Sequence, residues 1–188
     1  MANHLECEIK SMINEQQYLY LYNKYFHLGK LIKQENIYFN DRNGILKNSK
    51  ICLRIRTKQD SINLYIKTTI KEGNLEIKQP IDSFTKQQLI QKCILPNGEI
   101  KDYLHQINVD EKDLYLSGSL ITERLSILDG KYLICIDKSY YKNIVDYEIE
   151  IEGPTLLEAE QYAKNWFKKE NIPFSNNINI DLRLIDEE

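Results

Sequence analysis

Acidic residues occupy every second position in the segment DYEIEIE, which carries Glu148, Glu150 and Glu152. Side chains two residues apart lie on the same face of a β-strand, about 6 to 7 Å from each other. At an effective dielectric constant of about 20, each adjacent pair of these acids repels by roughly 2 to 3 kcal/mol. The pattern therefore indicates a bound divalent cation, or basic side chains that offset the repulsion. An edge strand with all its charges in water is the alternative.

The segment LECEIK near the start of the chain repeats this pattern with Glu6, Glu8 and Lys10. If the sheet closes into a barrel, its first and last strands lie side by side. Glu6 and Glu8 would then join Glu148 and Glu150 in a single acidic wall, opposite a wall of guanidinium and ammonium groups from the other strands.

Several further segments alternate between apolar and polar residues and are predicted to be strands, because a period of two is typical of a sheet with one buried face. The predicted strands cover residues 51–56, 62–67, 74–79, 119–127, 132–137 and 145–151. Basic residues gather on the polar faces of the earlier strands, namely Arg54, Arg56, Lys67, Lys78 and Arg124. Gly118-Ser119 is predicted to form a turn.

Four segments are predicted to be helical. Asn14 with Gln17, and Thr155 with Glu158, have the spacing of capping boxes, and they begin helices that end near Gly29 and Glu170. A third helix is predicted from Thr85 to Cys93, and a short one covers about residues 98–105. The helices carry apolar stripes, so we expect them to cover the apolar faces of the strands and leave the charged faces turned toward one another. An antiparallel sheet with an ordinary solvated face would explain the same alternation.

Composition favours one domain, residues 1–188, with a net charge of −3. A protein that binds the phosphate backbone of nucleic acid irrespective of sequence would be more basic. No sequence-specific nucleic-acid partner is expected either. No apolar run approaches the roughly 20 residues of a membrane span, and a cytoplasmic protein is predicted. The four cysteines are widely spaced and predicted to be reduced. The oligomeric state cannot be read from the sequence.

Carboxylate oxygens are ligands for Mg²⁺, Mn²⁺ or Ca²⁺, and converging Arg and Lys side chains bind phosphate oxygens. A site that combines the two is equipped for phosphoryl transfer. The glycine-rich motifs GxxxxGK[ST] and GxGxxG are absent, so the phosphate-binding loops of common nucleotide-binding folds are excluded.

The ordered set ExExK at residues 6–10, LRIR at 53–56, Lys67, LEIK at 75–78, TER at 122–124 and DYEIEIE at 146–152 resembles the CYTH family, also called triphosphate tunnel metalloenzymes. Within it, the sequence is similar to the YjbK-like branch of Firmicutes, whose members are often labelled adenylate cyclase. The resemblance implies an α+β fold with an eight-stranded antiparallel β-barrel, a charged interior and helices packed outside. It also implies a requirement for Mg²⁺ or Mn²⁺ and a small-molecule substrate that contains a triphosphate.

The resemblance also assigns roles by position. Lys10 matches a lysine that contacts substrate and helps to orient water, and is the candidate catalytic residue. The predicted metal ligands are Glu6, Glu8, Asp137, Glu148 and Glu150. The predicted substrate-binding residues are Lys10, Arg54, Arg56, Lys67, Lys78, Arg124 and Arg183. Glu76 and Glu152 are tunnel acids without a settled role.

The sequence is consistent with three functions. The first is metal-dependent hydrolysis of inorganic or organic triphosphate, and the second is adenylate cyclisation. The third is a module that binds polyphosphate or nucleotide without turnover. It is suggested by the C-terminal segment SNNINIDLR, which contains Arg183 but lacks the lysine that family members commonly carry in the corresponding segment.

Overall fold

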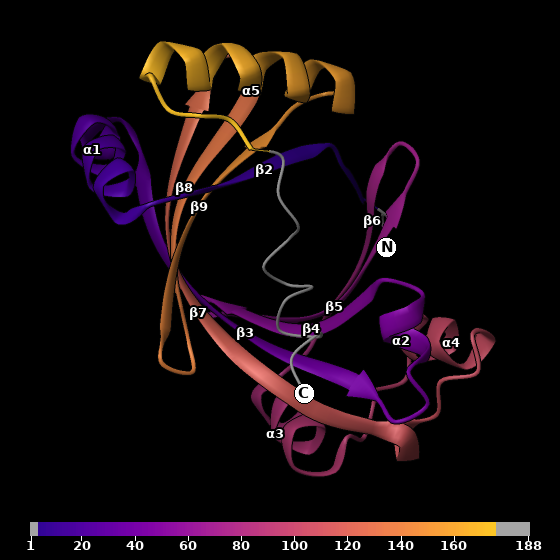
Figure 1. Ribbon diagram of the computed structural model, residues 1–188. Coiled ribbons are helices and arrows are strands. Elements are labelled where there is room, and N and C mark those ends of the chain that lie inside the picture. Colours follow the sequence, from indigo (N-terminus) through magenta and orange to yellow (C-terminus); the bar gives the residue numbers. More distant parts are fainter. Residues whose placement is uncertain (1–3, 176–188) are drawn as a thin grey trace.

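The computed structural model describes residues 4–175, and its centre is an antiparallel β-sheet curled around a lumen (Figure 1). The strands are β1 (His4–Glu6), β2 (Glu8–Ile13), β3 (Lys30–Asp41), β4 (Ile51–Lys58), β5 (Ser61–Ile70), β6 (Gly73–Pro80), β7 (Leu114–Asp129), β8 (Tyr132–Tyr141) and β9 (Ile144–Glu152). Their order in the sheet is β1-β6-β5-β4-β3-β7-β8-β9-β2.

The two edges of the sheet are joined by the first strand segment of the chain. β1 pairs with β6, and after a single residue, Cys7, the chain continues as β2 and pairs with β9. The backbone carbonyl of Cys7 accepts a hydrogen bond from the amide of Gly153 at 3.0 Å. Within residues 4–175, the nearly closed barrel therefore has nine strands instead of the expected eight, because this segment divides where it changes partner.

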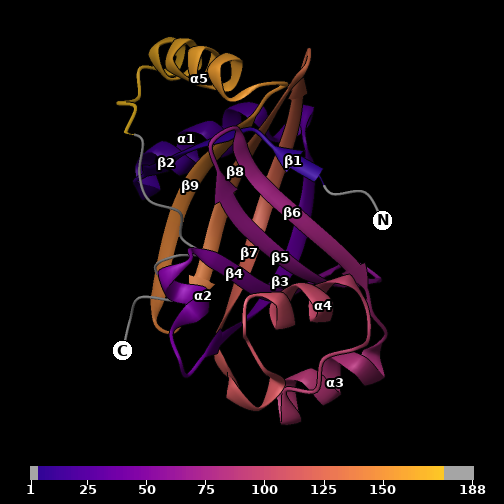
Figure 2. The ribbon, with the colours of Figure 1, turned by 90° about the vertical axis from the view of Figure 1, so that its right-hand side faces the viewer.

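The helices lie outside the barrel (Figures 1 and 2). They are α1 (Glu15–Tyr25), α2 (Ile45–Asn48), α3 (Ser83–Lys92), α4 (Glu99–Gln106) and α5 (Leu156–Glu170), with short 3₁₀ turns η1 (Phe26–Leu28) and η2 (Glu111–Asp113). α1 and α5 cover the outer face of β2, β8 and β9, whereas α2, α3 and α4 lie on the opposite side, around β3 to β6.

Two separate apolar cores fill the space between barrel and helices. Leu21 of α1 and Phe167 of α5 pack on Ile149 of β9 in one core. In the other, Leu104 of α4 belongs to the same buried cluster as Leu53 of β4. The apolar strand faces thus point outward, as predicted, because only the helices offer them an apolar partner.

The predicted helix starts are confirmed except in one case. The Asn14 and Gln17 side chains form a reciprocal capping box, and Thr155 accepts a hydrogen bond from the Glu158 amide. The predicted start at Thr85 is wrong, since α3 begins at Ser83 and its cap is Asp82, whose carboxylate accepts the Thr85 amide at 2.7 Å. Asp is as good an N-cap as Thr, so the sequence allowed both positions.

Two strand assignments also differ from expectation. β3 was not among the strands predicted from alternation, because Leu31 and Ile32 are adjacent and the next four residues, 33–36, are polar on both faces. β7 runs through Gly118, which was predicted to be in a turn; the β3–β7 pairing shifts there, with Tyr38 opposite Gly118 and Phe39 opposite Leu116. This β-bulge explains the turn-like local sequence.

The cysteines are free, as predicted; Cys7, Cys52 and Cys135 are also buried, whereas Cys93, which was expected to be buried as well, is partly exposed. Among residues 4–175, no helix combines the length and the apolarity needed to cross a lipid bilayer.

Glu170 joins α5 to α1 through a buried carboxylate. Its oxygens accept hydrogen bonds from Lys24 Nζ at 2.7 Å and Tyr25 Oη at 2.6 Å. Burial alone would raise the pKa of Glu170, but these two donors hold it below its usual value of 4.5.

We expect Glu170→Gln to lower the free energy of unfolding at pH 7 by about 1–2 kcal/mol, since charge-assisted hydrogen bonds are lost. A carboxyl group with a lowered folded pKa stabilises the protein above its unfolded pKa, and loses this effect as pH falls through the folded pKa. The deficit should therefore shrink as the pH falls below about 4.5. Urea unfolding across this range measures it. The control is Glu160→Gln on the same helix, whose exposed pair with Lys164 contributes little. A deficit that is unchanged at low pH would contradict the account.

Candidate functional site

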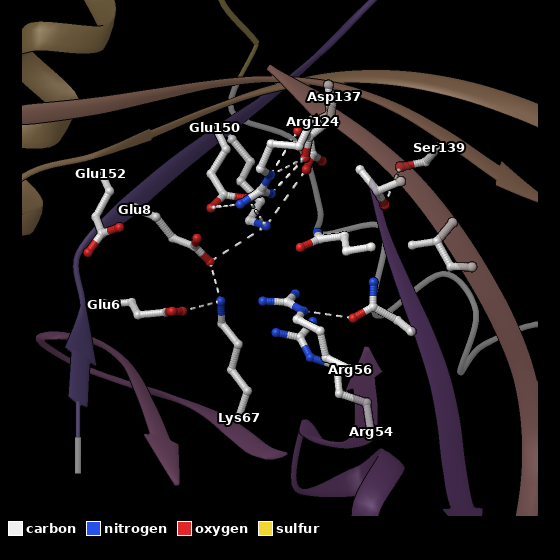
Figure 3. Close-up of a pocket in the computed structure, with 16 residues that line it drawn as sticks. Glu6, Glu8, Arg54, Arg56, Lys67, Arg124, Asp137, Ser139, Glu150 and Glu152 are labelled. Carbon is white, nitrogen blue, oxygen red and sulfur yellow. Dashed lines mark hydrogen bonds and ion pairs between the residues drawn. The ribbon is translucent and has the colours of Figure 1, made fainter. Parts of the chain in front are cut away.

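The inward faces of the strands line a cavity of about 560 Å³, including the part open to solvent (Figure 3). Leu120 is the only apolar residue in its lining among the described residues. The other lining residues are Glu6, Glu8, Lys10, Gln34, Asn36, Arg54, Arg56, Lys67, Thr122, Arg124, Asp137, Ser139, Glu148, Glu150 and Glu152. They come from strands at both ends of the sequence, so only closure of the barrel brings them together.

The acidic wall expected from the sequence is present. Lys10 of β2 is opposite Glu150 of β9 in the strand register, and Asp137 of β8 is opposite Glu148. Carboxylate oxygens of Asp137, Glu148 and Glu150 lie within 4.8 Å of one another, close enough to bind one cation together. The donors are all carboxylate oxygens, which suit Mg²⁺, Mn²⁺ or Ca²⁺.

Two lysines enter the acidic wall. Lys10 Nζ lies 2.8 Å from Glu150 Oε2, 3.6 Å from Glu8 Oε1 and 3.7 Å from Glu148 Oε1. Lys67 reaches across from β5, with its Nζ 2.7 Å from Glu6 Oε2 and 2.5 Å from Glu8 Oε1. Each ammonium group therefore offsets the repulsion of more than one carboxylate.

Arg124 also belongs to the acidic side, although the sequence suggested that it would join an opposing basic wall. It is opposite Asp137 in the β7–β8 register and donates to it from Nε at 2.9 Å and Nη2 at 2.6 Å. Its Nη2 also lies 2.9 Å from Glu150 Oε2. β7 is the neighbour of β8, so the register alone fixes this placement.

Arg54 and Arg56 form the opposite, basic side on β4 (Figure 3). Arg56 donates from Nε to Asn36 Oδ1 at 2.8 Å, and Arg54 Nη2 lies 3.3 Å from Glu76 Oε1. Both guanidinium groups lie within 6 Å of the ring centroid of Tyr65, at 5.8 and 5.6 Å, where cation–π attraction helps to position them.

Crowding and burial shift the pKa values of these acids in different directions. Burial first, and the charge of Glu150 second, raise the pKa of Glu8 to about 7. Burial also raises the pKa of Asp137, despite its pair with Arg124. For Glu150 the opposing charges of Arg124 and Lys10 outweigh burial and hold its pKa well below the usual range. One acid of the wall can therefore hold a proton at neutral pH, which a cation bound there would displace.

The remaining predicted site residues lie at the margin. Glu152 lines the cavity and Glu76 is buried against Arg54, whereas Lys78 is exposed and lies over the Tyr65 ring, outside the cavity lining. Arg183 and the rest of the C-terminal segment lie outside the described residues.

Five lining residues are not among the predicted site residues, namely Gln34, Asn36, Leu120, Thr122 and Ser139. Gln34 and Asn36 are on β3, and Ser139 on β8 exchanges a hydrogen bond with Thr122 at 3.0 Å. Uncharged polar side chains are common on any solvated strand, so nothing in the local sequence distinguished them. The one available signal concerned Asn36. A partly buried Arg56 needs a hydrogen-bond acceptor, and Asn36 provides it.

The family model of the CYTH domain matches residues 4–184 of this chain. This chain belongs to the CYTH family. It is 31% identical over 193 residues to the Bacillus subtilis (strain 168) protein named "Putative triphosphatase YjbK", a match that covers 100% of this chain and 97% of that protein.

Solved structures show the same fold. A Bacillus halodurans protein described as a putative adenylate cyclase has a TM-score of 0.90 and 28% identity, with 97% of this chain and 98% of that chain covered. HpAC1 from Hippeastrum, described as a putative adenylyl cyclase with a dominant triphosphatase activity, has a TM-score of 0.78 and 20% identity, with 93% and 92% covered.

In metal-free protein, we expect Glu8→Gln to raise the free energy of unfolding at pH 8, with the gain disappearing toward pH 4. The pKa of Glu8 rises on folding from 4.5 to about 7, so below pH 4.5 the carboxyl is neutral in both states and its replacement changes little. Above pH 7 folding must bury an ion that the substitution removes. Urea unfolding in EDTA tests this, with Glu72→Gln in the exposed β5–β6 turn as the control. A variant less stable than the native protein at pH 8 would contradict it.

Proposed function

We propose that this CYTH protein hydrolyses a triphosphate inside the lumen with the help of a bound divalent cation, Mg²⁺ or Mn²⁺. The observation that carries the proposal is the two-sided lining, in which a cluster of carboxylates faces Arg54 and Arg56 across one cavity. A cation bound by carboxylates and a phosphate chain bound by arginines are the two components of phosphoryl transfer. The triphosphatase names of two related proteins support the same activity.

In this proposal Asp137, Glu148 and Glu150 hold the cation, and Glu6 and Glu8 complete the acidic wall around it. A bound divalent cation would neutralise negative charge on the phosphate oxygens and would lower the pKa of a coordinated water molecule. The carboxylates orient it and exclude other ligands.

The basic side chains hold the substrate. Arg54 and Arg56 present planar donor groups that fit phosphate oxygens. Lys10, Lys67 and Arg124, which now neutralise the acids, are close enough to turn toward the phosphate chain when a cation takes over the carboxylates. Lys10 lies among three acids and is best placed to orient an attacking water and to stabilise the negative charge of the transition state.

Adenylate cyclisation is less well supported, because it requires a place for the purine ring. No aromatic side chain lines the cavity among residues 4–175, and its single apolar lining residue, Leu120, offers little surface for stacking.

The first test is phosphate and pyrophosphate release from inorganic triphosphate, thiamine triphosphate and ATP, with Mg²⁺, Mn²⁺ or EDTA. We expect metal-dependent release of phosphate that EDTA abolishes. Formation of cyclic AMP and pyrophosphate from ATP would establish the cyclase instead. Metal-dependent binding of triphosphate without release would establish the binding module.

We expect Lys10→Ala to lower kcat/KM for the best of these substrates by roughly a hundredfold, the usual effect of removing one preorganised charge donor. Lys33→Ala is the matched control, since Lys33 is exposed on the outer face of β3. Circular dichroism of both variants checks their folding. Full activity in Lys10→Ala would remove this lysine from the mechanism.

A further inference from the structure

An apolar layer lies on the inward faces of several strands, on one side of the charged cavity. It consists of Tyr38, Cys52, Leu120 and Tyr141, with Met12 packed against them. These residues come from β3, β4, β7, β8 and β2, which surround most of the barrel, and the four core members are each no more than 7% exposed. A phosphate chain cannot cross such a layer without losing its hydration for no compensating contact.

Strand directions place this layer at one particular end. β3 runs toward α2 and β4 runs away from it, so Cys52 lies near α2 and Lys58 at the other end of β4. Because neighbouring strands are antiparallel, Tyr141 at the end of β8 lies toward the α2 end as well. We call these the α2 end and the Lys58 end.

On β4 and β7, the exposure of the inward-facing side chains increases from the α2 end to the Lys58 end. On β4, Cys52 and Arg54 are buried at 4% and 2% exposed, Arg56 is intermediate and Lys58 is exposed. On β7, Leu120 and Thr122 are buried, whereas Arg124 is partly exposed. Water therefore reaches the cavity along these strands from the Lys58 end.

Basic residues stand at the Lys58 end. Lys58 continues the row formed by Arg54 and Arg56 on β4, and Lys30 and Lys78 are exposed at the same end of β3 and β6. Partial burial and the charges of Arg124 and Arg56 lower the pKa of Lys58, which agrees with its position beside the lumen cations.

We propose that the lumen has one working mouth, at the Lys58 end, and that a triphosphate enters it with its terminal phosphate first. This inference rests on the proposed function. The terminal phosphate carries more negative charge than an internal one. The most buried cationic side chains, Arg54 and Lys67, lie in the inner part of the cavity and can bind it there. The substrate class is then a chain with a free terminal phosphate, and any organic group stays at the mouth.

A direct consequence concerns long polyphosphate, which could be cut internally only if it threaded through an open tunnel. We expect a long linear polyphosphate with free ends to be shortened from its ends, and the same chain with both ends blocked as phosphoramidates to be neither hydrolysed nor bound. Gel electrophoresis follows chain length, and calorimetry with Mg²⁺ follows binding. Cleavage or tight binding of the doubly blocked chain would overturn the inference.

The outcome for inorganic triphosphate separates the two proposals. If it is hydrolysed and the blocked chain is also cut, the inference fails and the proposed function stands. If it is bound without turnover, the proposed function fails and selective binding of free-ended chains still supports the single mouth. If it is neither bound nor hydrolysed, both fail.

A matched pair of charge reversals on β4 tests which end is used. We expect Lys58→Glu to lower kcat/KM for inorganic triphosphate by about tenfold at low ionic strength, with a smaller loss at high salt, because steering by a charged mouth is screened. Lys50→Glu makes the same change in an exposed residue just before β4, at the α2 end. It should leave kcat/KM within about twofold. An equal or larger loss in Lys50→Glu would place the mouth at the other end.

Discussion

The structure depends on the mutual neutralisation of charges that the barrel buries. Carboxylates at Glu8, Glu148 and Glu150 could not share a closed space without partners, since the repulsion between buried acids is only weakly screened. Lys10 and Lys67 occupy the gaps between them. The barrel can therefore close around its own polar face, which in most sheets would be left to water.

This polarity sets the rest of the architecture. With the charges inside, most apolar side chains of the strands face outward and require a cover, which the helices supply in two separate cores. Glu170 then links α5 to α1, so the two helices that cover β2 and β9 contact each other as well as the sheet. A barrel of this kind is stabilised from outside, and its interior is left to the charged side chains.

The internal ion pairs also explain how such a site can bind highly charged ligands. A cation on the carboxylates and a phosphate chain on the arginines and lysines would replace pairs that already exist, so few buried charges would lose a partner. Arg124 illustrates this exchange, because it bridges Asp137 and Glu150 and so occupies the position where a cation and a phosphate would meet. The apolar layer built around Tyr38 borders this charged region on one side.

Alternation along the chain determined which residues point inward and which point outward, because the side-chain period of a strand is a local property. Glu6, Glu8, Lys10, Arg54 and Lys67 were all placed in the lumen on this basis, with the family resemblance. Only the tertiary structure decided that Arg124 joins the acids, that Gln34 and Asn36 line the cavity, and that one end is filled by apolar side chains. These features depend on which strands are neighbours, on their register and on closure of the barrel, and such pairings between distant segments are not written in any local pattern.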